Sequence, residues 1–178
     1  DESHQNFTAK SDAIIQLFKT DKIIRCSATP IESETAKLIE VSEDDVIAEG
    51  LIKKLLVINE DFPQVIETED QTHYLLGKAY AKQQKLRSLF LQRELDINPL
   101  IVVQLPNNSD ALCETVEKWF ESKNVTVEAE TLAIWLSGRH ENVDGISNNN
   151  AESVAVIMKQ AVATGWDCPR AHILVKLR

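Results

Sequence analysis

Several residue types are scarce in this sequence, and each shortage excludes a class of protein. Five glycines and five prolines among 178 residues are too few for long disordered linkers. The three cysteines, Cys26, Cys113 and Cys168, are widely spaced, with neither a Cys-x-x-Cys pair nor zinc-ligand spacing. Such scattered thiols fit a reducing compartment, so we expect a cytoplasmic protein. No apolar run approaches the roughly 20 residues that span a bilayer, so we expect no membrane contact.

Basic residues are also in short supply. Lysine and arginine together number 19 against 28 acidic residues, which gives a net charge of −9 and a pI near 5.0. Such a chain is not a general binder of polyanions, so a nucleic-acid contact needs a local basic strip or backbone N–H groups at helix starts. Apolar residues make up 43% of the chain, which is enough for the core of one domain, or of one domain plus part of another.

Helix and strand patterns alternate along the chain, which predicts an α/β fold built on a parallel sheet. The clearest buried strand is the apolar run Leu100–Leu105, and the clearest helix covers 71–95, with another beginning after Ser109. A capping box at Ser42 opens a short helix that Gly50 ends. The remaining expectations are a helix at 12–18, strands at 22–26, 51–58, 125–127, 132–136, 154–158 and 172–176, and loops at 59–70 and 137–150.

Two polar motifs near the start of the chain have the residue types of an ATPase. In Asp1-Glu2-Ser3-His4, Asp1 would hold Mg²⁺ through water, Glu2 would orient or deprotonate the attacking water, and His4 would relay the nucleotide state. The hydroxyls of Ser27 and Thr29 are able to couple to that acidic motif by hydrogen bonds. Solvated terminal charges and an ordinary strand-to-helix turn are the alternatives. No Gly-x-x-x-x-Gly-Lys-Ser/Thr loop occurs in the sequence.

Two later turns are candidates for ligand contact. In the segment 164–170, Gly165 allows close backbone approach, Asp167 accepts from a ribose hydroxyl, and Arg170 meets phosphate, as a nucleotide site would require. A tight turn around a packed Trp166 explains the same segment equally well. The turn 104–109 follows a strand and starts a helix, which suits phosphate contact, although plain helix capping is the alternative. The residues that we expect to contact nucleic acid are Gln104, Asn107, Asn108, Arg139 and Thr164.

Because these turns follow strands, we expect them to converge at one cleft beside the sheet. Other chemistries find little support. His73, His140 and His172 have no evident chemical partner, and His172 is expected to pack at the start of a strand. A serine hydrolase would need a Gly-x-Ser-x-Gly elbow, which the sequence lacks.

In their order and spacing, these motifs resemble those of superfamily-two DExH helicases and translocases, and most closely the ATP-dependent motor (Res) subunit of type III restriction enzymes. The resemblance spans essentially the whole chain. Its motifs are Asp1-Glu2-Ser3-His4 (the DExH box), Ser27-Ala28-Thr29 (the third motif), 49–54 (the lead into the second domain), 97–106 (the fourth motif) and 159–171 (the fifth motif).

The resemblance implies two RecA-like domains, with 1–42 as the tail of the first and 43–178 as most of the second. It implies ATP and Mg²⁺ as cofactors, Asp1, Glu2 and His4 as catalytic residues, duplex DNA as the track, and a methyltransferase subunit as partner. The phosphate loop would lie upstream of Asp1 and the arginine finger beyond Arg178, so we expect no ATP hydrolysis by these residues alone, and we expect 1–30 to dock poorly. The alternatives are a non-catalytic RecA-like interaction module and an RNA helicase of the same superfamily.

Overall fold

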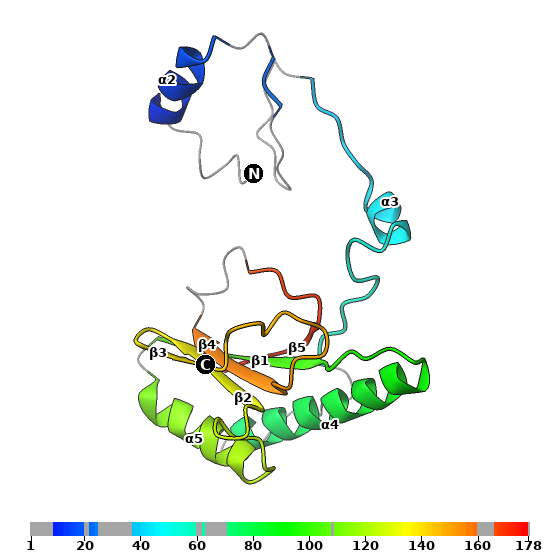
Figure 1. The fold of residues 1–178 in the computed structure, drawn as a ribbon, viewed down its shortest axis with the longest axis vertical. Coiled ribbons are helices and arrows are strands. Elements are labelled where there is room, and N and C mark those ends of the chain that lie inside the picture. Colours follow the sequence, from blue (N-terminus) through cyan, green and yellow to red (C-terminus); the bar gives the residue numbers. More distant parts are fainter. Residues whose placement is uncertain are drawn as a thin grey trace. The chain divides into compact units, whose positions relative to one another are not determined.

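The protein divides into two units, residues 1–62 and 63–178 (Figure 1). The computed structural model describes residues 9–19, 22–24, 37–59, 62, 71–107, 109–159 and 166–177. The division falls after Phe62, so the expected helix at Ser42 belongs to the first unit and not to the second domain, 43–178, in which the resemblance placed it. The assignment of the two units to two motor domains stays a prediction.

The first unit contains two short helices among its described residues, α2 (Ala9–Leu17) and α3 (Glu43–Ala48). The capping box is confirmed, because the Ser42 side chain accepts a hydrogen bond from the Asp45 N–H, and Gly50 follows the helix with φ of +69°. The expected strand at 51–58 is wrong, since this segment has no strand and leaves Leu51, Leu55 and Leu56 at least 75% exposed. The described part of the expected strand at 22–26, Lys22–Ile24, also forms no strand, and Ile24 is 91% exposed.

The second unit is a mixed α/β domain with a five-stranded, mostly parallel sheet, which confirms the expected fold class at this level. The strand order is β3-β2-β4-β1-β5, and only β3 runs antiparallel to its neighbour. The long apolar run is the central strand between β4 and β5. The bounds are β1 Leu100–Leu105, β2 Leu132–Leu136, β3 Arg139–Glu141, β4 Ala155–Lys159 and β5 Ala171–Lys176.

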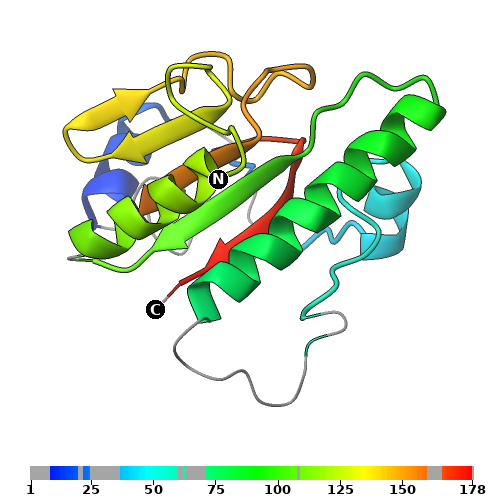
Figure 2. The same cartoon turned by 90° about the horizontal axis from the view of Figure 1, so that it is seen from below.

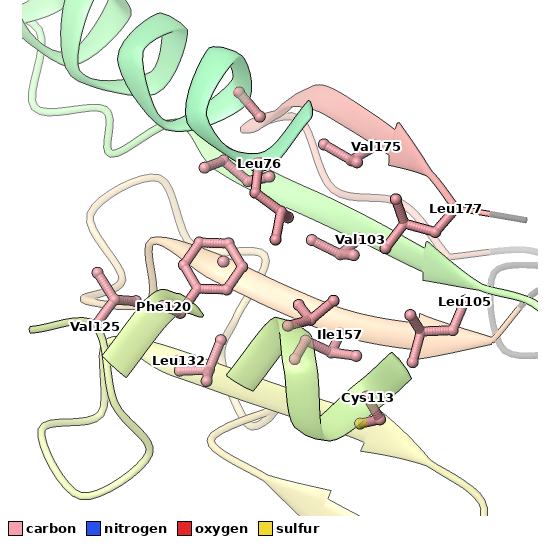
Figure 3. Packing of buried hydrophobic residues seen from close by; sticks show 14 of the residues in the cluster. Leu76, Val103, Leu105, Cys113, Phe120, Val125, Leu132, Ile157, Val175 and Leu177 are labelled. Carbon is pink, nitrogen blue, oxygen red and sulfur yellow. The ribbon is translucent and has the colours of Figure 1, made fainter. Parts of the chain in front are cut away.

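Two helices, α4 (Gln71–Gln92) and α5 (Asp110–Glu121), cover one face of this sheet (Figure 2). Leu76 of α4 and Phe120 of α5 are fully buried against alternate residues of the strands, such as Val103 and Ile157 (Figure 3). Burying these side chains is the main driving force for this layer. The short run Val125–Val127, which we expected to be a strand, instead forms a turn after α5, with Val125 packed beside Phe120.

The opposite face of the sheet is covered by connecting segments. Ile146, from the loop between β3 and β4, packs there with Trp166 and Cys168, from the connection between β4 and β5. Their partners on the strands include Leu100, Val102, Ala133, Val156 and Met158. In the part of the chain that the structure describes, no helix has the length and apolar character needed to cross a membrane.

Candidate functional site

The strand order creates a switch point between β1 and β4. The connection that leaves β1 contains α5, whose Val116 and Phe120 pack on the first face of the sheet. The connection that leaves β4 contains Trp166 and Cys168, which pack on the second face. In open α/β sheets, ligands bind outside the carboxyl ends of two neighbouring strands whose connections diverge in this way. The candidate site therefore lies at the carboxyl ends of β1 and β4.

The β1 side of this site is the turn that leads into α5. Gln104 is half-buried opposite Met158 and Lys176 on the neighbouring strands, whereas Asn107 is exposed. Ser109 is buried, and its Oγ donates to the Pro106 carbonyl at 2.7 Å instead of capping the helix. Because the side chain at the N-cap makes no cap bond, the first N–H groups of α5 are left without this partner. The capping expected at this turn therefore comes from position alone.

Lys159 supplies a cation on the β4 side of the switch point. It is the last residue of β4, and its Nζ lies 4.0 Å from the Asp110 carboxylate at the start of α5. Asp110 is 99% exposed, so this ion pair is well solvated and weak. Lys159 was not among the site residues expected from the sequence. The signal that could have found it was its place as the last strand residue before the motif-like segment 160–170.

The second expected turn separates from the first one. Trp166 packs edge-on against Trp135, with ring centroids 5.4 Å apart, and its Nε1 donates to Ser147 Oγ at 3.1 Å. The same Ser147 hydroxyl donates to the backbone carbonyl of Asp167 at 3.0 Å, and the Asp167 side chain is exposed. Ser147 belongs to the loop that precedes β4. The segment 166–170 therefore runs toward the amino ends of the strands.

Arg170 lies at the amino edge of the sheet and has no exposed surface. Its own carbonyl accepts from the N–H of Leu100, the first residue of β1. Burial lowers the pKa of the guanidinium, since desolvation disfavours its charge. The expectation that Arg170 meets phosphate is corrected on this ground. The expected convergence of 164–170 with Gln104 is corrected as well, because Arg170 lies beside the first residue of β1 and Gln104 lies near its last.

Arg139 is held by carboxylates. Its Nη1 donates to Glu117 of α5 at 2.8 Å, and its Nε donates to Glu141 at 3.1 Å, with Nη2 2.9 Å from the same Glu141 oxygen. These hydrogen bonds raise the pKa of the Arg139 guanidinium above its ordinary value. A phosphate would have to compete with both carboxylates, so the expected nucleic-acid contact of Arg139 gains no support from this arrangement.

Several expected site residues lie outside the described residues. They are Asp1, Glu2, His4, Ser27, Thr29, Asn108, Thr164 and Gly165. The expectations for catalysis, magnesium binding and coupling at these positions stay predictions. Among the residues that the structure does describe, no group of three His, Cys, Asp or Glu side chains is arranged to hold a metal ion.

A cavity of about 450 Å³ lies at the amino edge of the sheet, away from the switch point. Its walls come from the loop between β3 and β4 and include the acidic residues Glu130, Asp144 and Glu152. The acidic lining repels phosphate groups, so we place the candidate site at the switch point and not in this cavity. Comparisons with protein-family models, with curated proteins and with solved structures found no match.

Proposed function

We propose that this chain is part of an ATP-dependent nucleic-acid motor of the DExH type in helicase superfamily two, with DNA as the track. One observation carries the proposal. The two segments that resemble the fourth and fifth motor motifs start at neighbouring carboxyl ends, those of β1 and β4, and these two ends form the switch point of the sheet. In this proposal the second unit is a RecA-like domain.

The described residues suit contact with a phosphate backbone more than reading of bases. The amides of Gln104 and Asn107 and the ammonium of Lys159 supply hydrogen bonds and charge without a fixed sequence preference. The uncapped N–H groups at the start of α5 add positive potential. Such contacts position a motor on its track and leave its movement independent of sequence.

ATP and Mg²⁺ enter the proposal through Asp1, Glu2 and His4, as the resemblance implies. The whole complex would be a type III restriction enzyme that includes a methyltransferase subunit. Because the 178 residues contain no phosphate loop, they are expected to turn over no ATP by themselves. Magnesium-dependent hydrolysis by this purified chain, measured as phosphate release, would contradict this assignment.

The sharpest test of the nucleic-acid site is an NMR titration of the 178-residue chain with duplex DNA at low salt. We expect weak binding, with a dissociation constant of about 10⁻⁴–10⁻⁶ M, because the net charge of −9 opposes it. The largest amide shifts should occur at Gln104, Asn107, Asp110 and Lys159. No binding, or shifts confined to the acidic cavity at the amino edge, would overturn the proposal.

Lys159→Ala gives the matched mutational test. Loss of one phosphate contact should weaken binding at every DNA sequence and reduce the slope of log affinity against log salt by about one. The control is Lys123→Ala, since Lys123 lies just beyond the carboxyl end of α5 and stacks over Trp119 at 5.6 Å. Equal losses in the two variants would show that general charge and not the switch point attracts DNA. Competition with duplex RNA distinguishes the RNA-helicase alternative.

A second candidate function is a non-catalytic interaction module. It is favoured by the net charge of −9 and by the apolar segment 51–58, in which Leu55, Leu56 and Ile58 are 75%, 84% and 75% exposed. If the chain fails to bind DNA or RNA in the titration above, this candidate replaces the motor.

A further inference from the structure

Arg170 ties together the segments that lead into the central strands. Its Nη1 donates to the carbonyl of Asn98, before β1, at 2.6 Å and to that of Ser153, before β4, at 2.8 Å. Its Nε donates to the carbonyl of Ile146, in the loop between β3 and β4, at 2.7 Å. One buried guanidinium therefore joins three segments that are far apart in the sequence to its own segment.

A second set of hydrogen bonds supports these carbonyls. The Asn98 side-chain amide donates to the carbonyls of Ala151 and Glu152 at 2.9 and 3.2 Å. Its Oδ1 accepts from Gln83 of α4 at 3.0 Å, and Gln83 is itself 1% exposed. Buried polar groups connected in this way hold one backbone arrangement, because breaking any member leaves others unsatisfied.

The segment that Arg170 ends is anchored at several points. The Trp166 ring packs on Trp135, Ser147 bonds to both Trp166 and Asp167, and the Ala171 N–H donates to the Cys168 carbonyl at 3.0 Å. At the other end of the same connection, Lys159 is held in the β4 ladder. The two described ends of the β4–β5 connection are therefore both fixed by specific contacts.

We propose that Arg170 is a positioning residue for the switch-point site: it anchors the far end of the β4–β5 connection and so holds Trp166 and Asp167 in place for the ligand. This inference rests on the proposed function, which assigns Thr164, Gly165 and Asp167 to ligand contact. A short connection with both ends anchored loses little conformational entropy when a ligand binds it. Release of one anchor makes the ligand supply that ordering free energy, and affinity falls.

The test compares duplex-DNA affinity in Arg170→Lys and Arg170→Met with that of the unchanged chain. Both variants are measured at a temperature at which circular dichroism shows them folded. We expect about a tenfold loss of affinity for Arg170→Met and a smaller loss for Arg170→Lys, which keeps the charge and fewer hydrogen bonds. Trp135 and Trp166 report the same change, because release of Trp166 shifts the tryptophan emission to longer wavelength.

The matched control is Leu76→Ala, which removes a fully buried side chain of α4 on the opposite face of the sheet. It should lower thermal stability by a comparable amount and leave DNA affinity unchanged. Equal affinity losses in Leu76→Ala and Arg170→Met would show a merely structural role and overturn the inference. So would unchanged affinity in both Arg170 variants.

Chemical rescue keeps the test informative if Arg170→Met folds poorly. Arg170→Ala leaves space for a free guanidinium ion, which at concentrations far below the denaturing range should restore both the tryptophan emission and DNA affinity. An equal concentration of sodium ion is the control, and rescue by both salts would count against the inference. Failure of the unchanged chain to bind DNA overturns the proposed function instead, so the two failures are distinguishable.

Discussion

At the residue scale, Cys113 shows how the surroundings of one side chain set its chemistry. Its Sγ lies 3.2 Å from Glu117 Oε1, the same oxygen that accepts from Arg139, and its side chain is buried under α5. Burial, followed by the hydrogen bond to Glu117, raises the pKa of the Cys113 thiol from 9.0 to about 12. The thiol is therefore inert at neutral pH. The sequence shows a lone cysteine, and only the fold places Glu117 beside Arg139.

The raised pKa of Cys113 predicts a loss of stability in alkali. Below pH 9 both the folded and the unfolded thiol are protonated, and stability is independent of this group. As the pH rises from 9 toward about 12, the unfolded thiol ionises first, so the free energy of unfolding falls with a slope approaching about 1.4 kcal/mol per pH unit. Urea titrations of the unchanged chain and of Cys113→Ser over this window measure the difference. Parallel curves for the two proteins would show that Cys113 does not titrate on unfolding.

At the element scale, the sequence predicted the long and strongly patterned elements. The helices α4 and α5 and the strands β1, β2, β4 and β5 were expected within a few residues, because their apolar spacing reports directly which face they bury. The antiparallel β3 was missed, since its polar residues lie inside a stretch read as loop. Its pairing depends on a tight turn at Ser137 and Gly138, where Gly138 has φ of +81°, and on Arg139, held by Glu117 and Glu141.

The candidate site was predicted unevenly for a related reason. A strand followed by a polar turn is visible in sequence, so Gln104 and Asn107 were placed correctly at a carboxyl end. The direction in which a connection leaves that end depends on which face its apolar residues bury. Trp166 and Cys168 bury themselves on the second face and carry Arg170 to the amino edge. No local pattern in the sequence contains that information.

Two glycines in these elements predict stability changes of opposite sign. Gly138→Ala meets nothing within 4 Å, yet it forces a side chain into the left-handed region and should cost about 1–2 kcal/mol. Gly77→Ala lies inside α4, where the new Cβ would make an ordinary contact at 4.0 Å with Trp119, so it should stabilise the protein by about 0.5–1 kcal/mol. Thermal unfolding of both variants checks the pair. A melting temperature that moves in the same direction for both would show that backbone conformation does not decide the sign of the change at one of these positions.

At the scale of the whole molecule, the described hydrophobic core belongs to the second unit. Its strands and helices bury residues such as Leu76, Ile101 and Ile157 completely, whereas the described residues of the first unit leave Leu17, Ile39 and Leu56 at least 79% exposed. Stability of the domain therefore depends on burial that residues 63–178 supply from within themselves.

Residues 63–178 are accordingly predicted to fold when produced alone. The isolated unit should keep a cooperative thermal transition within a few degrees of that of the complete chain, because deletion of 1–62 removes little of the described buried surface. Differential scanning calorimetry of both proteins makes the comparison, with Leu76→Ala as a destabilised reference. A non-cooperative transition in the isolated unit would show that the first unit contributes to the core.

The place of β1 at the centre of the sheet has a consequence for synthesis. Among the described strands, β1 is the first to leave the ribosome, but its two partners, β4 and β5, are the last to follow, so both of its ladders join distant parts of the chain. Pairings of this kind form slowly, because the intervening chain must close before any contact is gained. A nascent chain halted before Ala155 presents the apolar run Leu100–Leu105 with neither side satisfied, and such a chain needs a chaperone.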